Sequence, residues 1–160
     1  VSASPALLEI GTQPRHTSDL YAYAGTFGNQ VLCIDLKSEK ILWRYEHPKW
    51  RFPFYASAAV TERVVVVGGR DKMVHALNPD TGKAVWTFAA RSRVDASAVI
   101  VGERVFFGTT GGEIYALNVN SGEQVWQFVT GSSIVASPSV AAGKLVIGSA
   151  DGVLYCFGER

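Results

Sequence analysis

A phrase of thirteen residues recurs in this chain about every forty residues, and this repetition constrains the fold more than any other feature. The copies lie at residues 31–43, 74–86, 114–126 and from Leu154 onward. A shorter phrase, Ala-Ser-Ala or Ala-Ser-Pro, keeps the same phase, because Ser57, Ser97 and Ser137 are 40 residues apart. A period of this length with several short strands per unit predicts a β-propeller or another repeat array.

Each repeat contains four segments with the composition of β-strands. In the third repeat these segments are Val94–Val99, Arg104–Thr109, Glu113–Asn118 and Gln124–Val129. They are rich in β-branched and aromatic residues and are bounded by glycine and asparagine turns. No stretch keeps apolar residues at helical spacing for three turns. The prediction is an all-β chain of four-stranded antiparallel blades, arranged radially as in a propeller.

The phase of the repeat divides residues 1–160 into about four blades. The predicted blades are blade one at 1–45, blade two at 54–88, blade three at 94–129 and blade four at 134–158. Blade four contains three predicted strands and lacks its outer strand. Two arrangements follow from this count. The chain is a partial ring with missing blades upstream, or a second copy of the chain supplies the other half of an eight-bladed dimer.

A tryptophan recurs on the outermost strand of each complete repeat. Trp43, Trp86 and Trp126 occupy this position, and an indole buries roughly 150–250 Å² of surface. We therefore expect these three residues to be structural spacers between neighbouring blades. The turns that precede Trp86 and Trp126 contain Gly82 and Gly122, which can supply the positive φ that a side chain resists.

Composition excludes some partners and favours none. The formal net charge of +1 provides no overall field that would attract nucleic acid. Apolar runs are far shorter than the roughly 20 residues of a membrane span. Cys33 and Cys156 occupy the repeat position that Ala76 and Ala116 hold elsewhere. Both cysteines are therefore expected to be small buried residues rather than a disulfide or metal ligands.

Aligned with one another, the copies spell Ala-x-Asn/Asp-x-x-Thr/Ser-Gly-Lys/Glu-x-x-Trp. The first copy departs from this pattern, with Cys33 in place of Ala and Glu39 in place of Gly. The pattern resembles the tryptophan-docking motif of the pyrroloquinoline quinone (quinoprotein dehydrogenase) propeller superfamily, and the resemblance covers nearly the whole chain. WD-type propellers are a poorer match, because no aspartate follows the tryptophans.

The resemblance implies a fold but leaves the activity open. The dehydrogenases of this superfamily hold their quinone with a vicinal disulfide and a calcium ion, whereas this sequence has no adjacent cysteines and its acidic residues are scattered. The chain is more similar to the non-enzymatic branch, which includes the propeller lipoprotein of the outer-membrane barrel-assembly machinery. That branch implies a scaffold for protein or ligand binding, an extracytoplasmic (periplasmic) location and no cofactor. Two alternatives stay open: a fragment of a quinoprotein dehydrogenase using pyrroloquinoline quinone and calcium, or an accessory or sensor propeller of a larger enzyme.

Binding is expected where the copies differ, because variable loops on a rigid scaffold commonly carry function. The step from Trp43 to Ser57 is 14 residues, against 11 in the next two repeats. The longer link contains the segment 44–55, which is aromatic, basic and rich in proline. Strand order places this link on the same face as the turns and links of the next blades.

The candidate binding face consists of Lys49, Trp50, Arg51, Arg70, Arg91 and Arg93. Our hypothesis is that this face binds an anionic or peptide partner around Trp50, Arg91 and Arg93. The alternative interpretation is a solvated basic rim, in which Trp50 and Phe52 pack over the edge of the blade.

Overall fold

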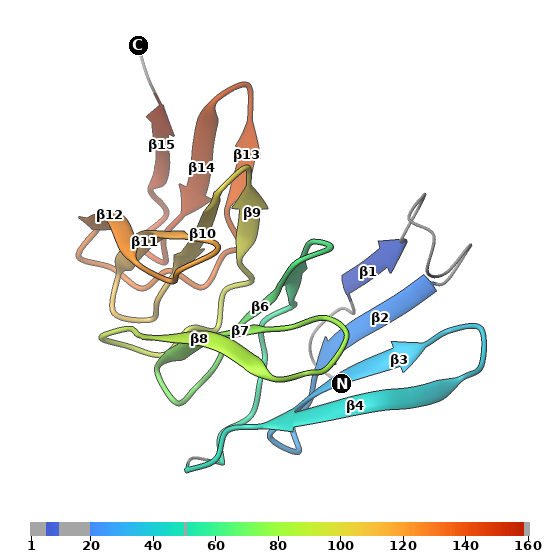
Figure 1. The fold of residues 1–160 in the computed structure, drawn as a ribbon. Helices are drawn as coiled ribbons and strands as arrows, with labels where there is room; N and C mark the ends of the chain where they lie inside the picture. The colour runs from blue at the N-terminus through green and yellow to red at the C-terminus, as the bar shows by residue number, and fades with distance from the viewer. Residues whose placement is uncertain (1–5, 10–19, 50, 159–160) are drawn as a thin grey trace.

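The computed structural model describes residues 6–9, 20–49 and 51–158, and all regular elements in these residues are β-strands. The strands form four sheets that follow one another in chain order, as Figure 1 shows. The predicted all-β architecture of antiparallel propeller blades is confirmed. Across the described residues there is no helix of the length and apolar character that a membrane crossing needs.

Each sheet is built from strands that are consecutive in the sequence and pair antiparallel. The first sheet contains β1 (Ala6–Glu9), β2 (Leu20–Gly25), β3 (Gln30–Asp35) and β4 (Lys40–Glu46). The second contains β5 (Ala59–Val60), β6 (Val65–Gly68), β7 (Met73–Leu77) and β8 (Ala84–Ala89). The third contains β9 (Val99–Val101), β10 (Arg104–Gly108), β11 (Glu113–Asn118) and β12 (Gln124–Val129). The fourth contains β13 (Ser139–Ala141), β14 (Lys144–Gly148) and β15 (Leu154–Gly158).

The third sheet tests the strand predictions directly. The strands predicted at 113–118 and 124–129 coincide with β11 and β12, whereas the inner strand predicted at 94–99 is wrong, since β9 begins only at Val99. The reason is that the Ala-Ser segments bond between sheets rather than within them. The Ser57 amide donates to the Ser97 hydroxyl at 2.9 Å. The Ser97 amide in turn donates to the Ser137 hydroxyl at 3.2 Å.

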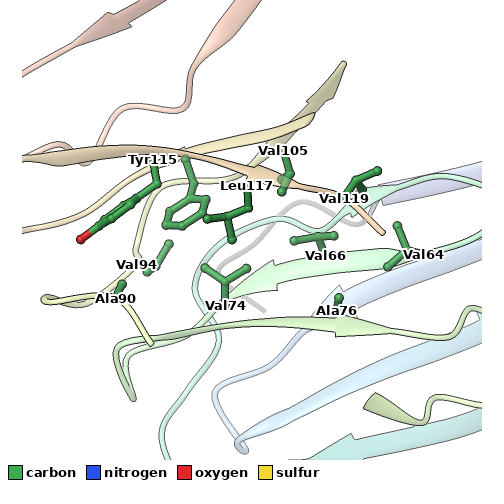
Figure 2. Close-up of a cluster of buried hydrophobic side chains, with 11 residues drawn as sticks. Val64, Val66, Val74, Ala76, Ala90, Val94, Val105, Tyr115, Leu117 and Val119 are labelled. Carbon is green, nitrogen blue, oxygen red and sulfur yellow. The ribbon is translucent and has the colours of Figure 1, made fainter. Parts of the chain in front are cut away.

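Neighbouring sheets pack through three apolar clusters, one at each junction. Their inner strands β1, β5, β9 and β13 also contact one another in succession. Figure 2 shows the cluster between the second and third sheets, where Val66 and Val74 of one sheet face Val105 and Leu117 of the next. Every second residue of these strands points to one side of the sheet, which is why the apolar residues reach two different neighbours.

The outer strands contain a bulge immediately before the tryptophan. Ala76 pairs with Trp86 but Leu77 pairs with Ala84, so Val85 is the extra residue, and the same register shift occurs in the first and third sheets. A bulged residue is left out of the ladder and turned away from the core. The bulge explains why Val85 and its repeat equivalents are exposed although they are large and apolar.

Two of the repeat tryptophans lie against a glycine turn of the next sheet. The Trp43 indole N–H donates to the Pro79 carbonyl at 2.8 Å. Its ring lies over Gly82, where a Cβ would come within 2.6 Å of the indole. Trp86 makes the same arrangement one sheet further on, with a 2.9 Å bond to the Val119 carbonyl and its ring over Gly122.

The outward side of the fourth sheet is not covered by another sheet within the described residues. Leu154 is 70% exposed, whereas its repeat equivalent Ile114 is fully buried at the preceding junction. The expectation that both cysteines are buried is therefore correct for Cys33 and wrong for Cys156, which is exposed. The same repeat position has opposite environments because a neighbouring sheet covers only one of them.

Candidate functional site

The candidate binding face is formed by the links that follow the outer strands and by the turns between the second and third strands of each sheet. Hydrogen bonds tie these segments together. The Ala90 amide donates to the Lys72 carbonyl at 2.8 Å, and the Thr130 amide donates to the Gly112 carbonyl at 2.9 Å. We call this end of the molecule the loop face, defined as the turns at 26–29, 69–72, 109–112 and 149–152 with the described links at 47–49, 51–58, 90–98 and 130–138.

The inserted link is anchored to the scaffold by Phe54. Its side chain is 1% exposed, and its amide donates to the Thr26 carbonyl at 3.1 Å. A Cβ on Gly25 would lie 2.7 Å from the Phe54 Cβ, so a glycine is required at this close approach. The link is therefore held in place at its centre, while its neighbours Arg51 and Phe52 remain exposed.

Arg70 is engaged inside the loop face. Its guanidinium donates two hydrogen bonds to the Asp95 carboxylate, each 3.0 Å long. The same guanidinium lies 3.9 Å from the ring centroid of Tyr55, which itself contacts Phe27 edge-on. A two-point ion pair stacked on an aromatic ring fixes the position of the arginine. Arg70 is thus a neutralised, positioned side chain of this face.

The other described cations of the candidate face are exposed. They are Lys49, Arg51, Arg91 and Arg93. Within residues 6–9, 20–49 and 51–158, Arg70 forms an ion pair with Asp95 and His75 lies within hydrogen-bond distance of Asp71, so Asp71 and Asp95 each have an internal partner. The exposed part of the face therefore carries net positive charge. Trp50, the remaining member of the predicted face, lies outside the described residues.

Beneath the inserted link, three polar side chains form a buried chain of hydrogen bonds. His75 is fully buried, its Nε2 lies 2.9 Å from the Asp71 carboxylate, and its Nδ1 lies 3.1 Å from the Tyr45 hydroxyl. The network assigns the imidazole proton to Nε2, which donates to Asp71, so that Nδ1 accepts from Tyr45. The His47 ring packs edge-on against His75, with centroids 5.5 Å apart.

This environment shifts the pKa values of Tyr45 and His47. Burial, and then the charge of Asp71, raises the pKa of Tyr45 to about 12. Burial, and then the neighbouring His75, lowers the pKa of His47 below its usual value.

Sequence analysis did not predict this buried network, although a signal was present. His75 stands where the later repeats have Tyr115 and Tyr155, and Tyr45 stands where they have Phe88 and Phe128. Simultaneous departures of two facing positions from the repeat indicate a local replacement of apolar packing by hydrogen bonds.

The described residues do not assemble a metal centre. No group of three or more His, Cys, Asp or Glu side chains in the described ranges is placed to hold an ion. In the same residues, every buried side-chain nitrogen and oxygen has a hydrogen-bond partner. The buried polar groups of the loop face thus hold its loops in position.

Comparison with known proteins places this geometry in a family. The profile of the family described as outer membrane protein assembly factor BamB matches residues 28–157. The crystal structure of BamB from Moraxella catarrhalis superposes with a TM-score of 0.77 at 24% identity, over 86% of this chain and 42% of that chain. No curated protein matches the sequence.

Two other solved structures share the fold. The computationally designed Ika8 protein has a TM-score of 0.77 at 16% identity, over 99% of this chain and 45% of that chain. A europium-containing methanol dehydrogenase has a TM-score of 0.61 at 19% identity, over 78% of this chain and 26% of that chain. The chain thus spans less than half the length of each of these structures, and at these identities the likeness establishes the fold.

Proposed function

Because this chain belongs to the outer membrane protein assembly factor BamB family, we propose that it is a non-catalytic β-propeller scaffold that binds a protein or peptide partner. The observation that carries the proposal is the combination of exposed charge and fixed loops on one face. The exposed cations of that face are Lys49, Arg51, Arg91 and Arg93. Arginines next to exposed aromatic rings are the residues that most often anchor protein interfaces.

The loops of this face are fixed before any partner arrives. Phe54 anchors the inserted link, the Arg70–Asp95 pair connects the second turn to the next link, and His75 supports both from below. A binding surface that is already ordered loses less conformational entropy on association. This arrangement supports recognition by a rigid surface rather than by a loop that folds on binding.

The chemistry of the face favours an acidic segment with an apolar side chain. Carboxylates of the partner would lie near Arg91 and Arg93, and an apolar side chain would pack on Phe52, which is 45% exposed. Charge complementarity of this kind steers association and selects the partner. A solvated basic rim without a partner is the competing interpretation of the same residues.

Similarity to the methanol dehydrogenase supports a second candidate, a fragment of a quinoprotein enzyme. The residues present do not fit that chemistry. A calcium or lanthanide site needs several carboxylate or amide oxygens. In the described part of the chain Asp71 and Asp95 are bonded to His75 and Arg70, with no third acidic group beside them. The remaining candidate, an accessory or sensor propeller of a larger enzyme, shares the same binding face.

The test compares charge reversals on and off the loop face. The variant Arg91→Glu/Arg93→Glu is compared with Lys37→Glu/Lys83→Glu, which makes the same change in exposed turns at the opposite ends of the strands. The probe is a fluorescent peptide library of acidic and apolar residues, read by anisotropy at low salt. We expect the loop-face variant to bind the best peptides at least about tenfold more weakly, with the control unchanged. Equal loss in both variants would indicate nonspecific charge attraction and overturn the proposal.

A further inference from the structure

We propose that the outer edge of β8 binds an extended segment of the partner as an added β-strand, with the acidic end of that segment beside Arg91 and Arg93. This inference rests on the proposed function, because it specifies how the acidic segment is bound. β8 is the outermost strand of the second sheet (Figure 1). The link that contains Arg91 and Arg93 begins directly after β8, so the strand edge leads into the charged part of the loop face.

The first observation is the direction of the backbone groups along this edge. In the described residues β8 pairs with β7 alone, and the Ala90 amide donates to the Lys72 carbonyl at 2.8 Å. This bond fixes the alternation of the antiparallel ladder, in which every second residue turns its N–H and C=O groups away from the neighbouring strand. By the register of the pair, the residues that turn outward are Thr87 and Ala89. Their backbone groups can pair with a further strand.

The second observation is the sequence of this strand. Residues 84–89 contain no charged residue and no proline, whereas β4, the outer strand of the first sheet, contains Lys40, Arg44 and Glu46. Charges and prolines are the usual means of blocking an exposed edge. Arg44 occupies the repeat position of Thr87. The second sheet therefore lacks the protection that the first sheet has.

The third observation is that the two ends of β8 differ in charge. Beyond its C-terminal end lie the exposed cations Lys72, Arg91 and Arg93. At its N-terminal end the exposed Lys83 is accompanied by the exposed Asp80. β12 has an equally uncharged edge, but the link that follows it contains no charged residue. Among the described outer strands, charge complementarity therefore selects β8 and places the acidic end of the partner segment at the loop face.

The two sides of β8 specify the side chains of the added strand. Trp86 and Phe88 are half-buried and pack against the apolar cluster between the second and third sheets. Thr87 and Ala89 point to the opposite side and are exposed. Because neighbouring strands place their side chains next to each other on each side of a sheet, the partner strand alternates. Its apolar side chains lie beside Trp86 and Phe88, and its small or polar side chains lie beside Thr87 and Ala89.

The experiment uses the fluorescent peptide Asp-Asp-Val-Thr-Val-Thr-Val, whose binding is read by anisotropy at low salt. All strand pairs in the described sheets are antiparallel, and a strand antiparallel to β8 has its N-terminal end at the loop face. The control is the same peptide with N-methyl groups throughout its Val-Thr part, which keeps the charges and side chains but removes the N–H donors. Strand addition obtains its affinity from backbone bonds, so we expect the control to bind at least about tenfold more weakly.

Two further measurements locate the peptide on the protein. Hydrogen exchange of the Thr87 and Ala89 amides should slow at least about fivefold when the peptide is added. Thr87→Pro should weaken binding about tenfold, because proline removes an outward donor without removing a bond to β7. Gln127→Pro makes the same change at the equivalent position of β12 and should leave binding unchanged. Equal losses in the two variants would overturn the proposal, and hydrogen exchange in the parent chain tests it even where a proline variant does not fold.

The Arg91→Glu/Arg93→Glu variant separates this inference from the proposed function. We expect the variant to bind the peptide at least about tenfold more weakly. Suppose that binding depends on the two arginines but is equal for the N-methylated peptide, and that the Thr87 and Ala89 amides are not protected. That result would overturn strand addition and leave the proposed function standing. Protection that is undiminished in the charge-reversed variant would overturn the placement of the acidic end, and absence of binding at millimolar peptide would overturn the whole inference.

Discussion

The two junctions of the third sheet contain the same kind of tryptophan and differ in what the described residues place against it. Toward the second sheet, Trp86 has a carbonyl partner and a glycine turn beneath its ring. Toward the fourth sheet, Trp126 contacts Phe128 and Phe157 and borders a cavity of about 860 Å³. The comparison shows that the tryptophan docks on a glycine turn of the following sheet, which supplies both a carbonyl acceptor and a surface for the indole ring.

The largest expected effect comes from removing Trp86, the tryptophan that docks on the glycine turn of the next sheet. Trp86→Ala should lower the free energy of unfolding by about 3–5 kcal/mol, because it leaves a large cavity in the junction. Trp126→Ala should cost at least about 1 kcal/mol less, since no indole hydrogen bond from Trp126 occurs among the described residues. Urea denaturation of both variants measures the difference, and equal losses would show that the docked turn contributes nothing.

The contribution of the glycine beneath the Trp86 ring can be tested in the same way. Gly122→Ala should cost about 2–4 kcal/mol, because the residue has a φ of +74° and its Cβ would come within 2.6 Å of Trp86. Gly102→Ala is the matched control, with a φ of +57° but no heavy atom within 4 Å of the added Cβ. Its cost should be about 1–2 kcal/mol from the backbone alone. Thermal unfolding resolves these two values, and a Gly102 variant as unstable as the Gly122 variant would contradict the steric explanation.

The first junction replaces part of this apolar packing with hydrogen bonds, which predicts a dependence on pH. Tyr45→Phe should cost about 1–3 kcal/mol at neutral pH, because His75 loses a buried partner. The folded pKa of Tyr45, about 12, exceeds the unfolded value of about 10. The stability from this tyrosine is therefore complete below pH 10 and is lost as the pH rises through 12. Chemical denaturation between pH 9 and pH 12 should show a shallower decline for the variant than for the parent chain, and parallel declines would exclude Tyr45 as the source.

The smallest effect concerns the turn of the first sheet. Glu39 occupies the repeat position of Gly82 and Gly122 and has a φ of 57°. Glu39→Gly should stabilise the chain by about 1 kcal/mol or less, since it removes the cost of a side chain in the left-handed region. Differential scanning calorimetry would detect the rise in Tm. A decrease would mean that the Glu39 side chain makes a contact that outweighs the strain.

Much of the fold could be predicted because it repeats. The strands at 113–118 and 124–129 follow from local composition, and Gly82 and Gly122 follow from turn chemistry. The inner strand was placed too early, because the sequence does not reveal that the Ser97 amide bonds to another sheet.

The candidate site was less accessible to sequence reasoning. Charge counting placed Arg70 with Arg91 and Arg93 on one face, but only geometry shows that Asp95 neutralises it. No sequence motif indicates that His75 contacts His47 and bonds to Tyr45 and Asp71. Most of these partners come from different repeats. Their contacts depend on how the sheets pack, and the order of residues in the sequence does not show this.

The serine bonds between sheets have a direction. In each of them the amide belongs to the earlier sheet and the hydroxyl to the later one, from Ser57 to Ser97 and from Ser97 to Ser137. A unit that extends this series beyond Ser137 must therefore present a hydroxyl acceptor, and one that precedes Ser57 must present an amide donor. The series is therefore polar, because every bond in it runs from the amide of one repeat to the hydroxyl of the next. Each step of the series thus needs the serine of the later sheet in the same orientation as Ser97 and Ser137.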